Sequence, residues 1–137
     1  MYLRFATFRI DPHARQEQGI FQASYDLIDG GELHPTEIHR LRVALRYFVL
    51  DLEVPEDVDP SAVFWFKCSC RACTRHGWLL ANALEATGLH VVPILTRKPG
   101  LIVYEDKCQV AAVPFRDTFV ARRLPTPRRR RPGPSRR

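Results

Sequence analysis

The feature that most constrains the fold of this 137-residue chain is a change in hydrophobic periodicity along its length. Up to about residue 87, the long apolar patterns show the spacing of three and four residues that is typical of amphipathic helices. Beyond that point the apolar runs are short and are separated by turn residues, as strands are. Helices in one block followed by strands in another predict an α+β fold.

The helical part of this pattern predicts three helices. The second is the clearest, because Pro35 suits a first helical turn and one apolar stripe follows it. Glycines at 30–31 and at 88 are typical helix ends. The predicted helices cover about residues 16–28, 35–52 and 69–87, and the stripe of the second consists of Ile38, Leu41, Leu45, Phe48, Val49 and Leu52.

The strand-like parts predict one antiparallel sheet. Pro99 and Gly100 predict a tight turn, so the last three strands are expected to form a meander. The first strand is expected to join them in a four-stranded, mainly antiparallel sheet with the helices packed on one face. The predicted order is β-α-α-α-β-β-β, with strands over about residues 1–10, 90–97, 101–106 and 108–115.

The C-terminal end differs from the rest of the chain in composition. Residues 122–137 are rich in arginine and proline and have no acidic residue, so they are expected to be a disordered tail after a compact domain over residues 1–121. Without the tail, 13 basic and 15 acidic residues give a net charge of −2. Non-specific affinity for RNA or DNA is therefore expected from the tail, through Arg122, Arg123, Arg128, Arg129, Arg130, Arg131, Arg136 and Arg137. The alternative is compositional drift, since the chain has 18 arginines and only 3 lysines.

The sequence also indicates a compartment. It has no apolar run long enough to span a membrane. Arg4 and Arg9 interrupt the apolar N-terminal stretch, so no export signal is expected. We therefore expect a cytoplasmic protein with reduced cysteines and no membrane partner.

Several segments resemble an uncharacterised family of small bacterial proteins. They are "QGIFQASYDL", "GELHPTEIHRLR", "FWFK" and "TRKPGLIVYEDKCQVAAVPF", and "PGLIVYED..QV" is the most specific. The resemblance covers about residues 1–117 and implies a single compact α+β domain. It implies no activity, and neither the cysteines of the third predicted helix nor the tail belongs to the shared pattern.

The segment "CSCRACTRH", residues 68–76, holds three of the four cysteines. On a regular helix Cys70 and His76 are about 120° apart around the axis and about 9 Å apart along it, so Cys70, Cys73 and His76 could not easily bind one zinc ion. The C-x-x-C spacing suits a redox pair, but the usual βαβ context is not predicted. The favoured interpretation is that Cys73 and His76 pack in the core, with no metal or other cofactor.

Two further groups are candidate binding surfaces. His39, Arg42 and Arg46 share the face of the second helix opposite its apolar stripe, and they could bind phosphates or form an ordinary solvated face. The aromatic run around Trp65 could stack on bases or belong to the core.

No nucleotide-binding or hydrolase motif is present, so no catalytic residue is predicted. The leading hypothesis is a non-enzymatic binding or adaptor domain with an unknown protein partner and a cationic tail. One alternative is a metal- or thiol-dependent protein that uses the segment 68–76, through Cys70, Cys73, His76 and perhaps Cys68 or the more distant Cys108. The other is a small enzyme whose site the sequence does not reveal.

Overall fold

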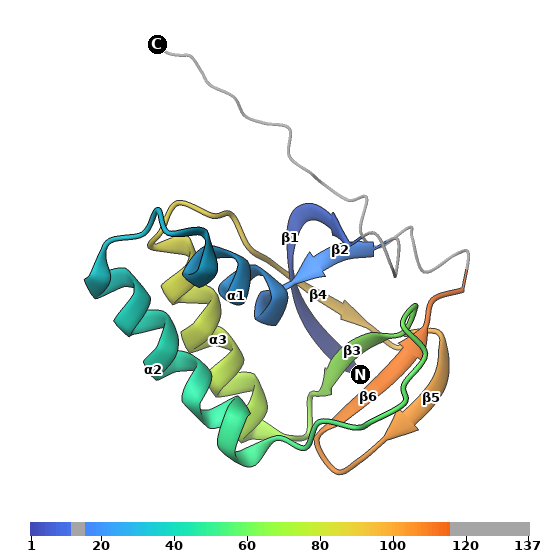
Figure 1. Ribbon diagram of the computed structural model, residues 1–137. Coiled ribbons are helices and arrows are strands. Elements are labelled where there is room, and N and C mark those ends of the chain that lie inside the picture. The colour runs from blue at the N-terminus through green and yellow to red at the C-terminus, as the bar shows by residue number, and fades with distance from the viewer. Residues whose placement is uncertain (12–15, 116–137) are drawn as a thin grey trace.

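The computed structural model describes residues 1–11 and 16–115 (Figure 1). Within these ranges the chain has three helices and a curled, six-stranded antiparallel sheet, so the predicted α+β class is confirmed. The predicted tail lies outside them. The elements are β1 (Tyr2–Asp11), β2 (Gln16–Gly19), α1 (Ile20–Gly30), α2 (Pro35–Asp51), β3 (Val63–Lys67), α3 (Arg71–Glu85), β4 (Val92–Thr96), β5 (Leu101–Glu105) and β6 (Gln109–Val113).

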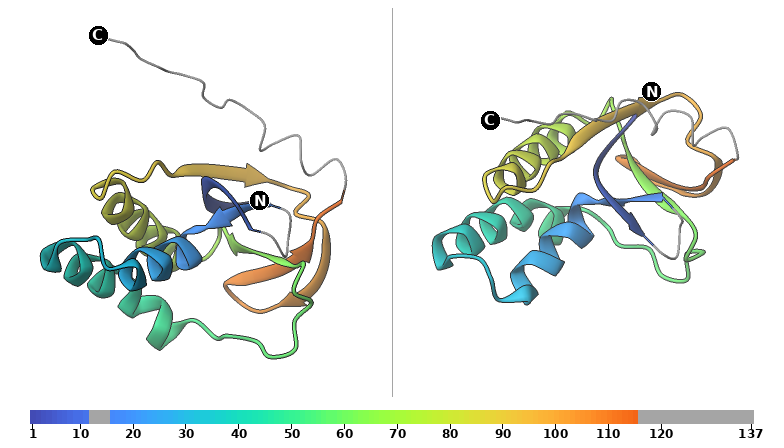
Figure 2. Two further views of the ribbon diagram at one scale, coloured as in Figure 1. Left: turned by 45° about the horizontal axis from the view of Figure 1, so that its top comes forward. Right: turned by 90° about the horizontal axis from the view of Figure 1, so that it is seen from above.

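Strand β1 is the centre of the sheet, because β2, β3 and β4 all pair with it. Leu3 pairs with Phe66 of β3 on one side and with Leu95 of β4 on the other. Beyond β3 the sheet continues through β6 to β5. Two further views show how the sheet curls away from the helices (Figure 2).

The predicted number of strands and part of their predicted pairing are wrong, whereas the antiparallel pairing of the last two strands is confirmed. The part of the chain that the structure describes has six strands, because β2 and the aromatic run of β3 both pair with β1. The predicted hairpin of β4 and β5 does not form, since β4 pairs with β1 and β5 with β6. Gly100 lies against the end of β6: its φ is +131°, and a Cβ there would clash with the carbonyl oxygen of Val113. Only a glycine allows this close approach to the end of β6.

The three helices lie together on one side of the sheet (Figure 1), as predicted. Successive strand residues point to opposite faces, so Phe66 of β3 packs in the core under the helices while Trp65 packs in a second cluster on the other face. Leu45 is buried, as its place in the predicted stripe requires, and Leu84 of α3 is buried as well. Val49, which the predicted stripe includes, is 63% exposed.

Helix α2 begins with a well-formed cap. The His34 side chain accepts a hydrogen bond from the Thr36 N–H, and the His34 N–H donates to the Glu37 carboxylate at 2.9 Å. These bonds satisfy groups that a helix start leaves without partners, and Pro35 at the first position needs none. Helix α2 then packs along α3. No helix in the described ranges is long and apolar enough to cross a membrane.

Candidate thiol site

Three cysteine sulfurs from two distant parts of the chain meet at the start of α3. The Sγ atoms of Cys70, Cys73 and Cys108 all lie within 4.8 Å of one another. Those of Cys70 and Cys108 are only 2.7 Å apart. That is closer than the roughly 3.5–4.0 Å at which smaller carbon atoms pack without a bond, and longer than a disulfide bond of about 2.05 Å. The start of α3 and the turn before β6 lie beside each other at the lower edge of Figure 1.

Cys70 reaches this place because the chain turns sharply between β3 and α3. The Cys70 N–H donates a hydrogen bond to the Lys67 carbonyl at 2.9 Å, which closes the turn. Cys70 is the N-cap of α3 and has extended backbone angles, φ −88° and ψ 91°. Cys73 follows one helical turn later and points into the core, where it is fully buried. The predicted helix began about two residues too early, at Ser69.

Cys108 is held by the turn between β5 and β6. The Asp106 carboxylate accepts hydrogen bonds from the backbone N–H groups of Cys108 and Gln109, at 2.8 and 2.9 Å. It also accepts one from the Tyr104 hydroxyl, which raises the pKa of Tyr104 to about 12. Burial alone would raise the pKa of Asp106, but these donors lower it. The Lys67 N–H donates to the Cys108 carbonyl at 2.8 Å and so ties this turn to the end of β3.

Helix α2 covers the buried side of the site. The Tyr47 hydroxyl lies 3.7 Å from the Cys73 Sγ atom. The Tyr47 ring stacks on the His76 ring with the two centroids 4.1 Å apart and the planes nearly parallel. His76 therefore forms part of the α2–α3 contact and is not part of the sulfur cluster.

The three thiols differ in acidity. Burial alone would raise the pKa of Cys70, but hydrogen bonding by Cys108, by the Cys73 thiol and by the Cys73 N–H lowers it below the ordinary thiol value. The pKa of Cys73 is raised, mainly by burial. The pKa of Cys108 is raised by its contact with Cys70 and by burial, and burial likewise raises that of Tyr47. Among these three thiols, the hydrogen bonds therefore favour ionisation of Cys70 over that of Cys73 and Cys108.

The sequence-based candidates in the segment 68–76 are partly brought together. Cys70 and Cys73 meet, whereas Cys68 is half-buried and lies outside the cluster. The sequence offers Cys108 only as a possible further member of this group, because it is the one thiol outside the segment 68–76. The only local signal was its place in a turn just before a strand, which does not specify the partner.

The other two candidate binding surfaces are the arginine face of α2 and the aromatic run of β3. Arg42 and Arg46 are exposed on α2, where they line a shallow groove together with Tyr25, Leu45, Val49 and Leu50. Trp65 is buried in the core on the far face of the sheet, so it does not offer a stacking platform. The arginines of the predicted nucleic-acid-binding tail, residues 122–137, lie outside the described residues.

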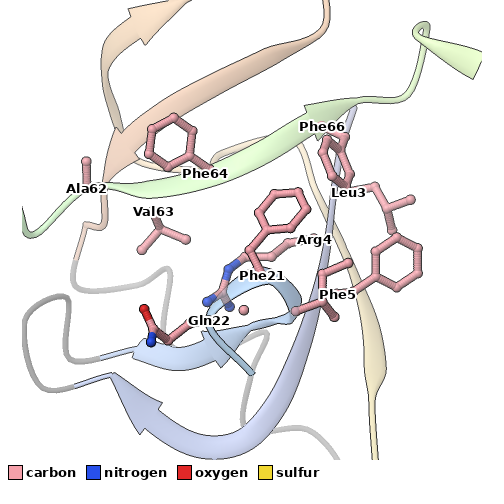
Figure 3. Close-up of a pocket in the computed structure, with 11 residues that line it drawn as sticks. Leu3, Arg4, Phe5, Phe21, Gln22, Ala62, Val63, Phe64 and Phe66 are labelled. Atoms are coloured by element: carbon pink, nitrogen blue, oxygen red, sulfur yellow. The ribbon is translucent and has the colours of Figure 1, made fainter. Parts of the chain in front are cut away.

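A separate cavity of about 150 Å³ lies between the start of β1, the start of α1 and β3 (Figure 3). Phe21, Phe64 and Phe66 form much of its lining. The Arg4 guanidinium points into it and donates a hydrogen bond to the Glu17 carbonyl. It contains no cysteine and is separate from the thiol site.

Comparison of the chain with protein-family models, curated proteins and solved structures finds no match. The resemblance to a family of small bacterial proteins stays a prediction, and function must be argued from the geometry of the thiols.

Proposed function

We propose that this is a redox-active dithiol protein in which Cys70 and Cys108 alternate between two thiols and one disulfide. The 2.7 Å separation of their sulfurs carries the proposal. Closing a disulfide from this position requires a movement of only about 0.7 Å. The geometry thus favours the thiol-dependent alternative over the adaptor hypothesis.

The surroundings of the pair support different roles for the two sulfurs. Both side chains are half-buried, so neither is enclosed in the core as Cys73 is. Cys70 lies at the N-terminal end of α3, where helix N–H groups stabilise negative charge. A thiolate, rather than a thiol, is the nucleophile in disulfide exchange. Cys70 is therefore the attacking residue and Cys108 the resolving residue.

The reaction is exchange with a low-molecular-weight disulfide. The Cys70 thiolate attacks one substrate sulfur, so a mixed disulfide forms and the other substrate half leaves as a thiolate. Cys108 then loses its proton and attacks the Cys70 sulfur, which closes the Cys70–Cys108 bond and releases the second half. Two electrons pass from the protein to the substrate, and the two protons of the dithiol end on the two product thiols. Excess reduced thiol reverses the sequence.

The test is anaerobic equilibration of the full chain with mixtures of reduced and oxidised glutathione, followed by acid quenching, alkylation and peptide mass mapping. We expect one disulfide, Cys70–Cys108, with Cys68 and Cys73 alkylated after denaturation. The Cys108→Ser variant should stop at a mixed disulfide between Cys70 and glutathione, because the resolving sulfur is missing. The matched control Cys68→Ser should behave as the unchanged chain.

Two results would contradict the proposal. One is an absence of any disulfide over the whole range of glutathione mixtures. The other is a dominant disulfide between Cys70 and Cys73, which would make Cys108 a bystander.

A further inference from the structure

We propose that the reduced forms of Cys70, Cys73 and Cys108 bind one Cu(I) ion as three thiolate ligands. This inference goes beyond the exchange reaction. It uses Cys73, whose sulfur forms no bond in the exchange reaction, and it requires only that the three thiols are reduced.

The positions of the sulfurs suit a three-coordinate site. Three sulfurs around a metal at about 2.3 Å lie roughly 4 Å from one another when the arrangement is trigonal and planar. All three Sγ atoms already lie within 4.8 Å of one another. The pair Cys70 and Cys108 must open from 2.7 Å to about 4 Å, and both are half-buried side chains at the edge of the core. Cys73 is fixed in the core and supplies the rigid side of the site.

The number and type of the ligands favour Cu(I) over Zn(II). Structural zinc is almost always held by four ligands in a tetrahedron. Among the residues described in the structure, the group at this site contains three cysteines and no histidine or carboxylate. The nearby imidazole of His76 is stacked on Tyr47 instead. Thiolates are soft ligands that select Cu(I) when no further ligand completes a tetrahedron.

The surroundings of the sulfurs are suited to a negatively charged metal–thiolate group. The first turn of α3 contains no acidic residue, and its N–H groups lie at the site. The Tyr47 hydroxyl is placed to donate to the Cys73 sulfur at 3.7 Å, as partners outside the ligand set often do. The carboxylate of Asp106 lies close enough to oppose negative charge on Cys70 and Cys108, but it is held by its own hydrogen bonds in the turn.

Metal binding and disulfide formation exclude each other, because they place the Cys70 and Cys108 sulfurs at different separations and in different oxidation states. A substitution at Cys73 distinguishes the two proposals experimentally. Its removal takes away a metal ligand and leaves both sulfurs of the disulfide in place.

The experiment is an anaerobic titration of the full-length, reduced protein with Cu(I) in competition with bicinchoninate, together with sulfur-neighbour counting by X-ray absorption. We expect one Cu(I) per chain with three sulfur neighbours. Cys73→Ser should weaken binding by at least about tenfold, since even partners outside the ligand set are worth that much. The same variant should still form the Cys70–Cys108 disulfide in glutathione mixtures, and Cys68→Ser should change neither property.

Thermal melting shows whether Cys73→Ser is folded. If it is not, Cys108→Ser replaces it, since Cys108 is half-buried in a turn and should also lose Cu(I) binding. The proposal is overturned by an absence of stoichiometric Cu(I), by full affinity in a folded ligand variant, or by Zn(II) displacing Cu(I) from the site. If the disulfide forms but Cu(I) does not bind, only the Cu(I) proposal is wrong. If Cu(I) binds but the disulfide does not form, only the proposed exchange function is wrong.

Discussion

At the scale of single residues, Cys70 and Cys73 have different surroundings although they are three positions apart. Cys70 caps α3, has an extended backbone and is half-buried. Cys73 is fully buried, with the Tyr47 hydroxyl 3.7 Å from its sulfur. Burial raises the pKa of Cys73, whereas hydrogen bonding lowers that of Cys70. Accessibility and acidity therefore both favour Cys70 as the reactive thiol.

This difference predicts the order of alkylation. In reduced, chelator-treated protein, iodoacetamide should modify Cys70 well before Cys73 at neutral pH. The rate at Cys70 should also level off at a lower pH than the rate at Cys108, because a lowered pKa means that the thiolate is fully formed earlier in a pH series. Timed quenching and peptide mass mapping measure all four sites in one sample. Equal rates at Cys70 and Cys73 would show that the helix start opens readily in solution.

At the scale of elements, local spacing predicted helices better than strand partners. Helix α2 was expected over about residues 35–52 and is observed over Pro35–Asp51, because Pro35 and the apolar stripe act within one segment. Strand β2 differs from the prediction, since its residues Gln16–Gly19 have no apolar alternation and fall in the predicted first helix, which in the structure begins only at Ile20. The approach of Cys108 to Cys70 depends on the pairing of β3 with β6, where Phe66 faces Gln109. No local pattern specifies that pairing, so the sequence could name Cys108 only as a possible member of the site.

The packing of α3 can be tested with two leucines on the same helix. Leu84 is fully buried, and Leu79 is 52% exposed. Leu84→Ala should lower the free energy of unfolding by roughly 2–5 kcal/mol, because it removes buried contacts and leaves a cavity. Leu79→Ala should change it by no more than about 0.5 kcal/mol, as is usual at the surface. Urea denaturation followed by tryptophan fluorescence compares the two. A large loss for Leu79→Ala would mean that this face of α3 is covered in solution.

At the scale of the whole molecule, the thiol site exists only when the fold is assembled. Its sulfurs come from the β3–α3 connection and from the β5–β6 turn, and the backbone bond from Lys67 to Cys108 joins these two parts. Cys70 and Cys108 are 38 positions apart in the chain. The turn at Asp106 and the end of β3 must therefore both be in place before the sulfurs can meet. Substitutions in the turn at Asp106 or at the end of β3 are therefore expected to alter the reactivity of the thiols even though no cysteine is replaced.

The distribution of charge over the whole chain leads to the last prediction. Residues 1–121 have a net charge of −2, while residues 122–137 carry eight arginines and no acidic residue. The full chain should therefore bind RNA and DNA without sequence preference. Its affinity should fall steeply between about 50 and 200 mM salt, because the release of counterions from the nucleic acid contributes less free energy at higher salt. Fluorescence anisotropy with labelled RNA and DNA across a salt series measures this.

Deletion of residues 122–137 is the matched comparison. It should abolish binding and leave the melting temperature almost unchanged, because the deleted segment contains Leu124 as its one large apolar residue, while residues 3–110 of the described part already form two hydrophobic clusters. If the truncated chain binds as tightly as the full chain, the exposed pair Arg42 and Arg46 on α2 becomes the expected contact, and their replacement by alanine in the truncated chain should then remove binding. If neither chain binds at about 50 mM salt, where counterion release is most favourable, the tail has no nucleic-acid function and its arginines reflect compositional drift.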